Sequence, residues 1–288
     1  LKELNERGDF TQNYEEVLRI NNINVQAANL LAGVYYQRKN YEQAEECYKR
    51  ALTMLDKNKD AEEMTMAKYN LSTVLFDDGK LVDAEKYARE AYEGKDSLRS
   101  NSAKAEIIYN YALILDNTGK DNDAISIYME VLGKNPDHSK TKLNLGNMYL
   151  GLNPPEIDTA ISLFKQVYDK DNDNIEANNQ LGNAYLAKQD YESSITFYQR
   201  ALKLDSKNNA IRANLAKAYA QSGDYDYAKA TYTELLKSDK ENWDAYIELA
   251  KVCMQLDDNT NAEKYLIYVQ EKNPGYRKNE VSDLLNSI

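Results

Sequence analysis

Apolar residues recur every three or four positions along most of this 288-residue chain, and the pattern itself repeats. In residues 175–204, Leu181 and Tyr185 share one helical face, and Ile195 and Tyr198 share another. Such spacings place side chains on one side of an α-helix. The pattern therefore predicts two amphipathic helices in each repeat, joined by a short turn.

Small residues occupy a fixed position in each of these helices. The first helix of the pair carries the column Ala32, Ser72, Ala112, Gly146, Gly182, Ala216 and Ala250. The second helix carries the column Ala44, Ala84, Ala124, Ala160, Ser194, Ala228 and Ala262. The second column follows the first by 12 residues in every repeat except the fourth. A small side chain lets two helix backbones approach closely, so the columns predict packed helical hairpins.

The turn inside the hairpin is marked by three glycines. Gly79, Gly119 and Gly223 lie between the two columns, where a helix often ends in a residue with positive φ. The first two repeats are 40 residues long, whereas most of the others have 34, and the six extra residues fall around positions 56–64 and 94–102. Longer helices or longer loops are expected there.

One repeat shows the pattern almost completely, with Leu145, Gly146, Tyr149, Ala160 and Phe164 at the characteristic positions. An aromatic column accompanies it at Tyr48, Tyr128, Phe164, Tyr198 and Tyr232. Together these columns resemble the tetratricopeptide repeat family. The resemblance implies an all-α fold, a right-handed superhelical solenoid of about seven helix-turn-helix units.

Two positions depart from the family pattern. The family's tryptophan is mostly replaced, and its closing proline survives only as Pro136 and Pro274. The predicted fold is unaffected, because the columns between the helices carry the packing.

The repeat divides residues 25–275 into seven predicted units. Their approximate ranges are 25–64, 65–104, 105–138, 139–174, 175–208, 209–242 and 243–276. Residues 1–24 are expected to be a truncated repeat, with a short helix from about Thr11 to Ile20. At the other end, residues 277–288 are expected to form a capping helix that shields the last unit. Its apolar stripe is Val281, Leu284, Leu285 and Ile288.

The charge of the chain disfavours two classes of partner. With 36 Lys and Arg against 47 Asp and Glu, the net charge is −11, which opposes binding to nucleic acid or to an anionic membrane surface. Cys47 and Cys253 are too few for a disulfide framework or a cysteine-based zinc site. The cytoplasm is favoured, and a periplasmic or secreted location stays open because the chain starts within a predicted repeat.

Residues capable of catalysis or metal binding are few. His138, the only histidine, follows Pro136 in a predicted turn between units and is interpreted as a solvated loop residue. Asp169, Asp171 and Asp173 have the spacing of a calcium loop, but Asn174 stands where the sharp-turn glycine is needed, so a polar turn is favoured. We expect no catalytic residue, no bound metal and no cofactor.

Asparagine is frequent on the predicted first helices, although it is a mediocre helix former. The family's packing implies that residues two before and one after the first small column face a concave groove. The candidate groove residues at these positions are Asn70, Asn110, Asn144, Asn147, Asn183, Asn214, Lys217 and Lys251. Asn179 is a further candidate, as are Tyr36, Tyr69, Phe76 and Tyr109 near the N-terminal end. One interpretation is that the chain simply uses asparagine freely. The other is an amide ladder that holds the backbone of an extended partner, with the aromatic residues adding apolar pockets.

Three functions are compatible with these features. The favoured one is a noncatalytic scaffold or adaptor that binds a protein or peptide segment in the groove during the assembly of a complex. The alternatives are a substrate-recruiting arm of a larger enzyme and a solenoid that associates with itself. The carboxylate clamp of some family members is not expected, because Asp244 and Glu248 stand where cations are required and would repel a terminal carboxylate.

Overall fold

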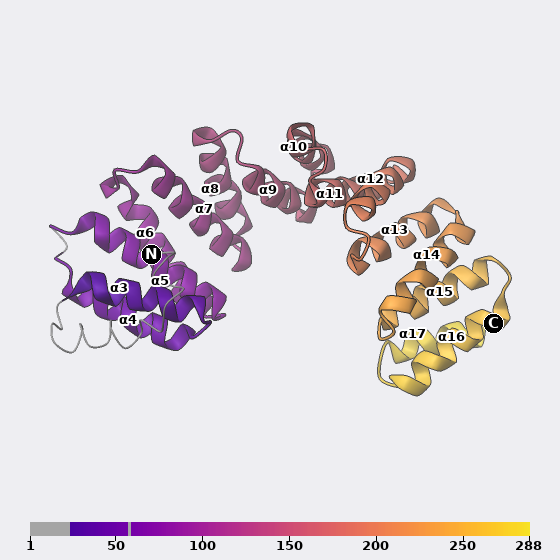
Figure 1. Cartoon of the computed structure of the whole chain (residues 1–288). Coiled ribbons are helices and arrows are strands. Elements are labelled where there is room, and N and C mark those ends of the chain that lie inside the picture. The colour runs from indigo at the N-terminus through magenta and orange to yellow at the C-terminus, as the bar shows by residue number, and fades with distance from the viewer. Residues whose placement is uncertain (1–23, 57–58) are drawn as a thin grey trace. The chain divides into compact units, whose positions relative to one another are not determined.

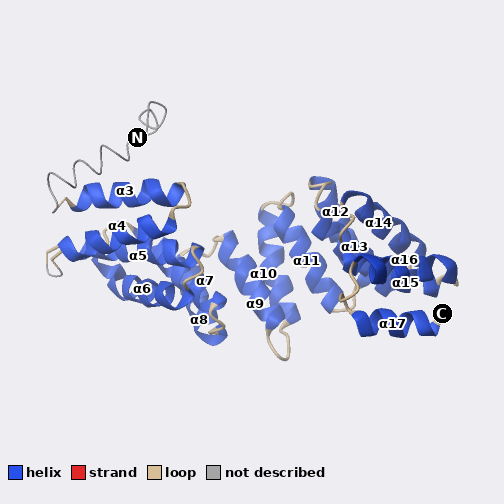
Figure 2. Cartoon of the chain, turned by 90° about the horizontal axis from the view of Figure 1, so that it is seen from below, coloured by secondary structure: helices blue, strands red, loops and turns tan. Residues whose placement is uncertain are grey.

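The structure is a computed structural model that describes residues 24–56 and 59–288. The helix expected from Thr11 to Ile20, and the rest of the truncated repeat before it, lie outside the described residues. Within the described ranges the chain is all-α, with 15 α-helices and no strand (Figures 1 and 2). The predicted fold class, an all-α fold of tetratricopeptide-like helix pairs, is confirmed.

The chain divides into two compact parts, and the boundary along the sequence lies between Thr141 and Lys142. The helices of the N-terminal part are α3 (Val25–Gln37), α4 (Tyr41–Met54), α5 (Ala61–Asp77), α6 (Leu81–Gly94), the 3-10 turn η1 (Lys95–Ser97), α7 (Asn101–Asn117) and α8 (Asp121–Lys134). Helix α9 (Ser139–Gly151) spans the boundary. The helices of the C-terminal part are α10 (Ile157–Lys170), α11 (Ile175–Ala187), α12 (Tyr191–Leu204), α13 (Asn209–Ser222), α14 (Tyr225–Ser238), α15 (Trp243–Gln255), α16 (Asn259–Lys272) and α17 (Lys278–Ser287). Within each part, helices that follow one another in sequence pack against one another.

Both columns of small residues are buried in the helical hairpins, as predicted. The aromatic column of the second helices is buried with them, and Tyr128, Phe164 and Tyr198 are fully enclosed. The two glycines of the first column have a steric reason to be there. A Cβ atom at Gly182 would lie 2.5 Å from the ring of Tyr198, and one at Gly146 would collide with Phe164. The close approach of the two helices in these hairpins therefore depends on the missing side chain.

Positive φ angles occur at the turn inside the hairpins. Gly79, Gly119 and Gly223 have φ of 77°, 71° and 89°, as their position predicted. Lys39 and Gln189 occupy the same position in other hairpins, also with positive φ. The turn geometry is therefore imposed by the packing of the hairpin, because it persists where the residue does not favour it.

Asparagine caps the start of several first helices. Asn174, Asn208 and Asn242 each accept a hydrogen bond from the backbone N–H three residues later. In the long repeats, the extra residues add a turn to the next first helix, so α5 and α7 have 17 residues each.

Helix α17 covers the last hairpin. Val281 is 2% exposed, and Leu284 and Leu285 pack partly buried against the same apolar cluster. Ile288 was expected to complete this stripe, but it lies beyond the end of the helix and is 37% exposed. The stripe is therefore shorter than the sequence predicted.

Candidate functional site

A polar pocket of about 650 Å³ lies among α11, α12 and α13 in the C-terminal part. Its lining residues are Asn183, Leu186, Ala187, Gln189, Tyr191, Tyr198, Asn214, Lys217 and Gln221. Three of them, Asn183, Asn214 and Lys217, are candidate groove residues from two successive first helices. The structure thus brings Asn183 together with two candidates that lie 31 and 34 residues later in the sequence.

The amide side chains beside this pocket form a hydrogen-bonded network. Asn214 Nδ2 donates to Asn179 Oδ1 and to Asn183 Oδ1, at 3.4 Å each. Asn183 Nδ2 donates to Gln180 Oε1 at 2.7 Å. These contacts link α11 to α13, so the amides of neighbouring units are fixed relative to one another.

Tyr198 on α12 holds the network in place through a hydrogen bond to Asn183. Its hydroxyl donates to Asn183 Oδ1 at 2.5 Å, and its ring is fully buried. Burial raises the pKa of Tyr198 well above its usual value, so the hydroxyl stays protonated and remains a donor. Because Oδ1 of Asn183 accepts this bond, the Nδ2 group of the same amide is directed elsewhere, toward Gln180 and the pocket.

Asn110 in the N-terminal part departs from the expectation of a groove-lining amide. It is only 9% exposed. Its Oδ1 accepts from the Ser72 hydroxyl at 3.0 Å, and its Nδ2 donates to Thr73 Oγ1 at 3.3 Å. Asn110 therefore joins α7 to α5, and its hydrogen bonds serve packing between units.

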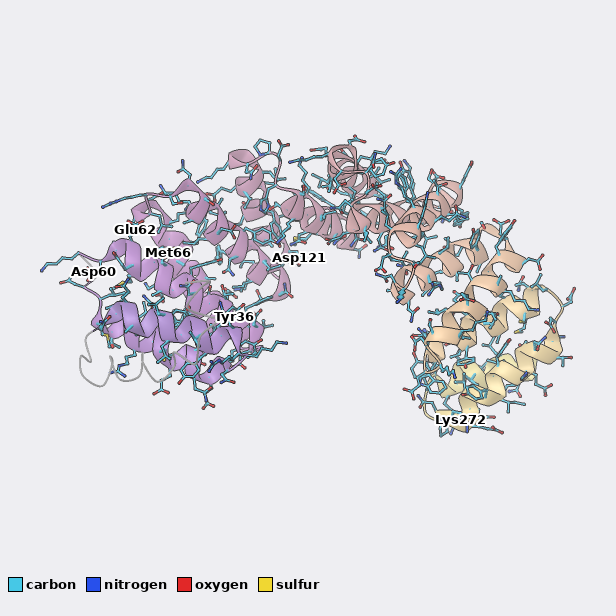
Figure 3. The ribbon with its side chains drawn as sticks, in the orientation of Figure 1. Tyr36, Asp60, Glu62, Met66, Asp121 and Lys272 are labelled. Atoms are coloured by element: carbon cyan, nitrogen blue, oxygen red, sulfur yellow. The ribbon has the colours of Figure 1, made fainter. Side chains whose placement is uncertain are left out.

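The aromatic candidates near the N-terminal end are half-buried and engaged with the protein. Tyr36 lies on α3 (Figure 3). Its hydroxyl donates to Asp77 Oδ2 at 2.5 Å, and burial together with this bond raises its pKa. Tyr109 packs against the ring of Tyr128, and Tyr69 and Phe76 are each packed against an apolar cluster. Each of these residues has a packing role, and the apolar pockets expected from them remain a prediction.

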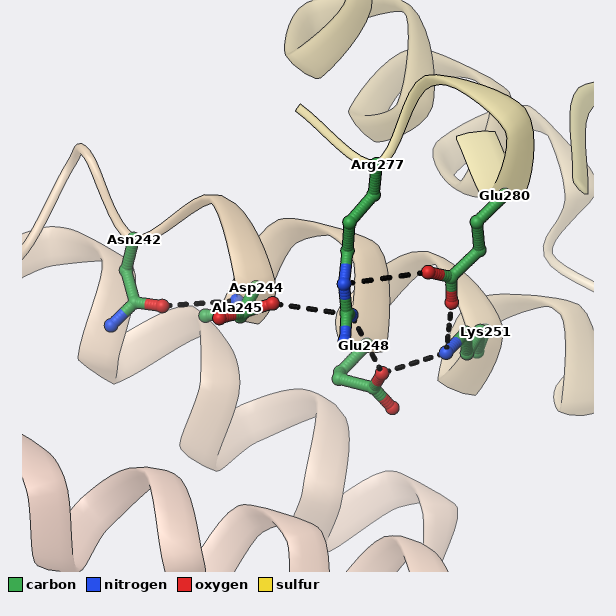
Figure 4. Close-up of polar contacts among 7 residues, drawn as sticks. All are labelled: Asn242, Asp244, Ala245, Glu248, Lys251, Arg277 and Glu280. Atoms are coloured by element: carbon green, nitrogen blue, oxygen red, sulfur yellow. Dashed lines mark hydrogen bonds and ion pairs between the residues drawn. The ribbon is translucent and has the colours of Figure 1, made fainter. Parts of the chain in front are cut away.

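Lys251 is half-buried and belongs to an ion-pair cluster that joins α15 to α17 (Figure 4). Its Nζ lies 2.7 Å from Glu248 Oε1 and 2.8 Å from Glu280 Oε1. Burial opposes the charge of Lys251, but its hydrogen bonds to the two glutamates outweigh burial and raise its pKa. Lys251 was a candidate for partner binding, yet the structure shows both of its carboxylate neighbours supplied by the chain itself.

Arg277 completes this cluster. Its Nη1 lies 3.1 Å from Asp244 Oδ1 and 4.0 Å from Glu248 Oε1. The sequence predicted that these two acids would repel a terminal carboxylate, and the structure adds that both lie within ion-pair distance of Arg277. Glu280 at the start of α17 pairs with both cations of this cluster, so α17 is tied to α15 through these ion pairs.

His138 is a helix cap, which differs from the solvated loop residue expected. The Thr141 backbone N–H donates to its Nδ1 over 3.3 Å, and the Thr141 hydroxyl lies 2.7 Å from the same nitrogen. Its ring also makes an edge-on contact with Tyr109, at 5.2 Å between centroids. Burial is the main cause that lowers its pKa. His138 therefore takes the position that asparagine holds before α11, α13 and α15.

A second pocket was not anticipated from the sequence. It has a volume of about 550 Å³ and lies on α15 and α16, lined by Tyr246, Tyr265, Tyr268 and three neighbouring residues. Trp243 adjoins it, with its ring 6.1 Å from that of Tyr246. The helical spacing of these aromatics was the available signal, but core packing explained it equally well.

Two further findings concern the described ranges 24–56 and 59–288. They contain no group of three or more His, Cys, Asp or Glu side chains arranged to hold a metal ion. No helix in them has both the length and the apolar character of a membrane span.

The repeating hairpins define an α-helical repeat protein of the class that serves as a scaffold for protein interactions. Models of the tetratricopeptide repeat match residues 24–97, 105–138 and 214–276, and a further model of this repeat matches residues 182–223. The chain therefore belongs to the tetratricopeptide repeat family. None of the matched models describes a catalytic domain. No curated protein matches the sequence.

Solved structures support the same fold. A tetratricopeptide repeat protein from Parabacteroides merdae aligns with a TM-score of 0.67 at 18% identity, over 96% of this chain and 98% of that one. A chain of the APC/C hetero-tetramer Cut9–Hcn1 aligns with a TM-score of 0.62 at 18% identity, over 95% of this chain and 51% of that one. YrrB, described as a tetratricopeptide repeat protein with an unusual peptide-binding site, aligns with a TM-score of 0.52 at 16% identity, over 66% of this chain and 91% of that one. At these identities the likeness establishes the fold.

Proposed function

We propose that this chain is a noncatalytic scaffold that binds an extended segment of a partner protein at the pocket formed by α11, α12 and α13. The amide network of this pocket is the observation that carries the proposal. An extended segment has backbone N–H and C=O groups that need partners, and each asparagine offers both a donor and an acceptor.

The amide network is preorganised by hydrogen bonds within the protein, yet some of its donors and acceptors have no partner in the network. Its bonds use Asn179 only as an acceptor and Asn214 only as a donor. The Nδ2 of Asn179 and the Oδ1 of Asn214 can therefore serve a ligand. Because Tyr198 and Gln180 already hold Asn183, little side-chain entropy is lost when the ligand binds.

The structural comparison adds support of a general kind. YrrB shares the fold and is described as having a peptide-binding site. The same type of ligand suits a polar pocket in this chain that holds several amides but no carboxylate among its lining residues.

The test is to select peptides from a displayed library of random extended segments and to measure their dissociation constants. Replacing Asn179, Asn183, Asn214 and Gln221 by Ala should weaken the binding of the selected peptides by about 0.5–1.5 kcal/mol for each lost hydrogen bond. A matched control is Asn259→Ala, an exposed position on α16. The far-ultraviolet circular dichroism of each variant reports whether the helices are intact. Unchanged affinity in the quadruple variant would contradict the proposal.

A further inference from the structure

The pocket beside the amide network carries a single charge. Among its nine lining residues, Lys217 is the only ionised side chain, although the chain as a whole has a net charge of −11. Asp190 is the adjacent residue to two lining positions, Gln189 and Tyr191. Its carboxylate is used as a helix cap, accepting from the backbone N–H and the hydroxyl of Ser193. What distinguishes Lys217 is its place in a pocket that has no acidic lining residue.

The repeat provides an internal comparison for Lys217. The position 34 residues later is Lys251, which lies between Glu248 and Glu280. The position equivalent to Glu248 beside Lys217 is Asn214, which is neutral. Within the described part of the chain, Lys217 has no carboxylate within 4.0 Å. The fold therefore pairs Lys251 with carboxylates of the chain itself, whereas Lys217 in the preceding unit is exposed and has no such pair.

The groups around Lys217 suit an anion that also needs hydrogen-bond donors. The pocket offers the Lys217 ammonium together with the amide N–H groups of Asn183 and Gln221. A carboxylate has two oxygens and about four acceptor sites, so it can take several of these donors at once. A cation or a purely apolar side chain would leave them unused.

We propose that this pocket binds the side-chain carboxylate of an aspartate or glutamate within the extended partner segment, and that Lys217 makes the scaffold selective for acidic segments. The inference rests on the proposed function, because it assigns the side chain that enters the pocket while the amides hold the backbone. It differs from recognition of a chain end, since the acid lies inside the segment.

The experiment uses the full chain and the same displayed peptide library, screened against the wild type and two variants. Lys217→Gln removes the charge in the pocket, and Lys203→Gln removes an exposed charge on α12 outside it, so both variants have the same net charge. We expect acidic residues to be enriched in peptides selected by the wild type and by the Lys203 variant. The Lys217 variant should lose this enrichment.

A selected peptide then allows a double-substitution cycle. Replacing its internal Glu by Gln should weaken binding to the wild type by about tenfold, and should change binding to the Lys217→Gln variant by less than about twofold. Raising the salt concentration should weaken the binding of the Glu peptide more than that of the Gln peptide. Amidating the peptide's C-terminus should have no effect.

Each contrary result has a distinct meaning. If peptides bind and depend on Asn183 and Asn214 but show no acidic preference, the groove stands and the role of Lys217 is wrong. If binding depends on a free C-terminus and not on an internal acid, the carboxylate in the pocket belongs to the chain end and the inference is wrong. If no peptide is retained by the wild type, both the proposed function and this inference are overturned.

Discussion

The backbone of Gly182 lies directly against the aromatic ring of Tyr198. A Cβ atom at position 182 would approach this ring to 2.5, 2.6 and 2.9 Å at three of its carbons. The same tyrosine donates the hydrogen bond that fixes Asn183 in the candidate pocket. The packing of the hairpin and the geometry of the pocket therefore depend on one contact between α11 and α12.

Gly182→Ala should destabilise the protein by about 1–3 kcal/mol, because the ring must move and has no free space. Urea denaturation followed by circular dichroism measures the change. Gly33→Ala is the control, since no atom lies within 4 Å of a Cβ at that position in α3, and it should stabilise by up to about 1 kcal/mol. Equal effects of the two substitutions would refute the steric argument.

His138 should make the stability depend on pH. Burial lowers its pKa in the folded state, so the neutral imidazole is favoured by folding. Its contribution is fully present above the unfolded pKa of about 6.5, and is lost as the pH falls from there through the lower folded value. His138→Asn keeps an acceptor for the Thr141 N–H and has no titrating ring. The variant should therefore lose less stability than the wild type between pH 7.5 and 5.5 in urea titrations. Parallel curves for the two proteins would contradict this prediction.

Asn110→Ala should reduce the free energy of unfolding by about 1–3 kcal/mol, because two hydrogen bonds with Ser72 and Thr73 are lost in a buried position. Asn122 on α8 is exposed, and its replacement by Ala should change stability by less than about 0.5 kcal/mol. Thermal and urea unfolding of both variants provide the comparison. A stability of the Asn110 variant equal to that of the wild type would show that this amide is dispensable for packing.

Lys39→Gly should stabilise the first described hairpin by about 0.5–1 kcal/mol. Lys39 has φ of 60°, a conformation that is unfavourable for a residue with a Cβ atom. The reverse substitution, Gly79→Lys, places lysine at the equivalent turn of the next hairpin, where φ is 77°, and should destabilise by a similar amount. Urea denaturation of both variants tests whether the signs are opposite, and effects of the same sign would contradict the prediction.

The site could be only partly predicted from sequence. The positions of Asn183, Asn214 and Lys217 on first helices followed from the repeat, and the structure places them around one pocket. Their hydrogen-bond partners did not follow, because an amide can bond to a ligand or to a neighbouring amide with the same helical spacing. The partners of Asn110 and Lys251 lie on other helices, so only packed coordinates distinguish them from ligand-binding residues.

The sequence by itself determined the helical hairpins and their order, because a fixed period of small and aromatic residues leaves few ways to bury an apolar face. It also indicated the turns at Gly79, Gly119 and Gly223, where the residue type matches the backbone conformation that packing imposes on every hairpin turn named above. Tertiary structure decided which polar groups are satisfied within the protein. Hydrogen bonds and ion pairs between helices are sensitive to differences of a few tenths of an ångström in donor–acceptor distance, and these distances are set by packing rather than by spacing along the chain. For the same reason, the contrast between the paired Lys251 and the exposed Lys217 appears only when the helices are assembled.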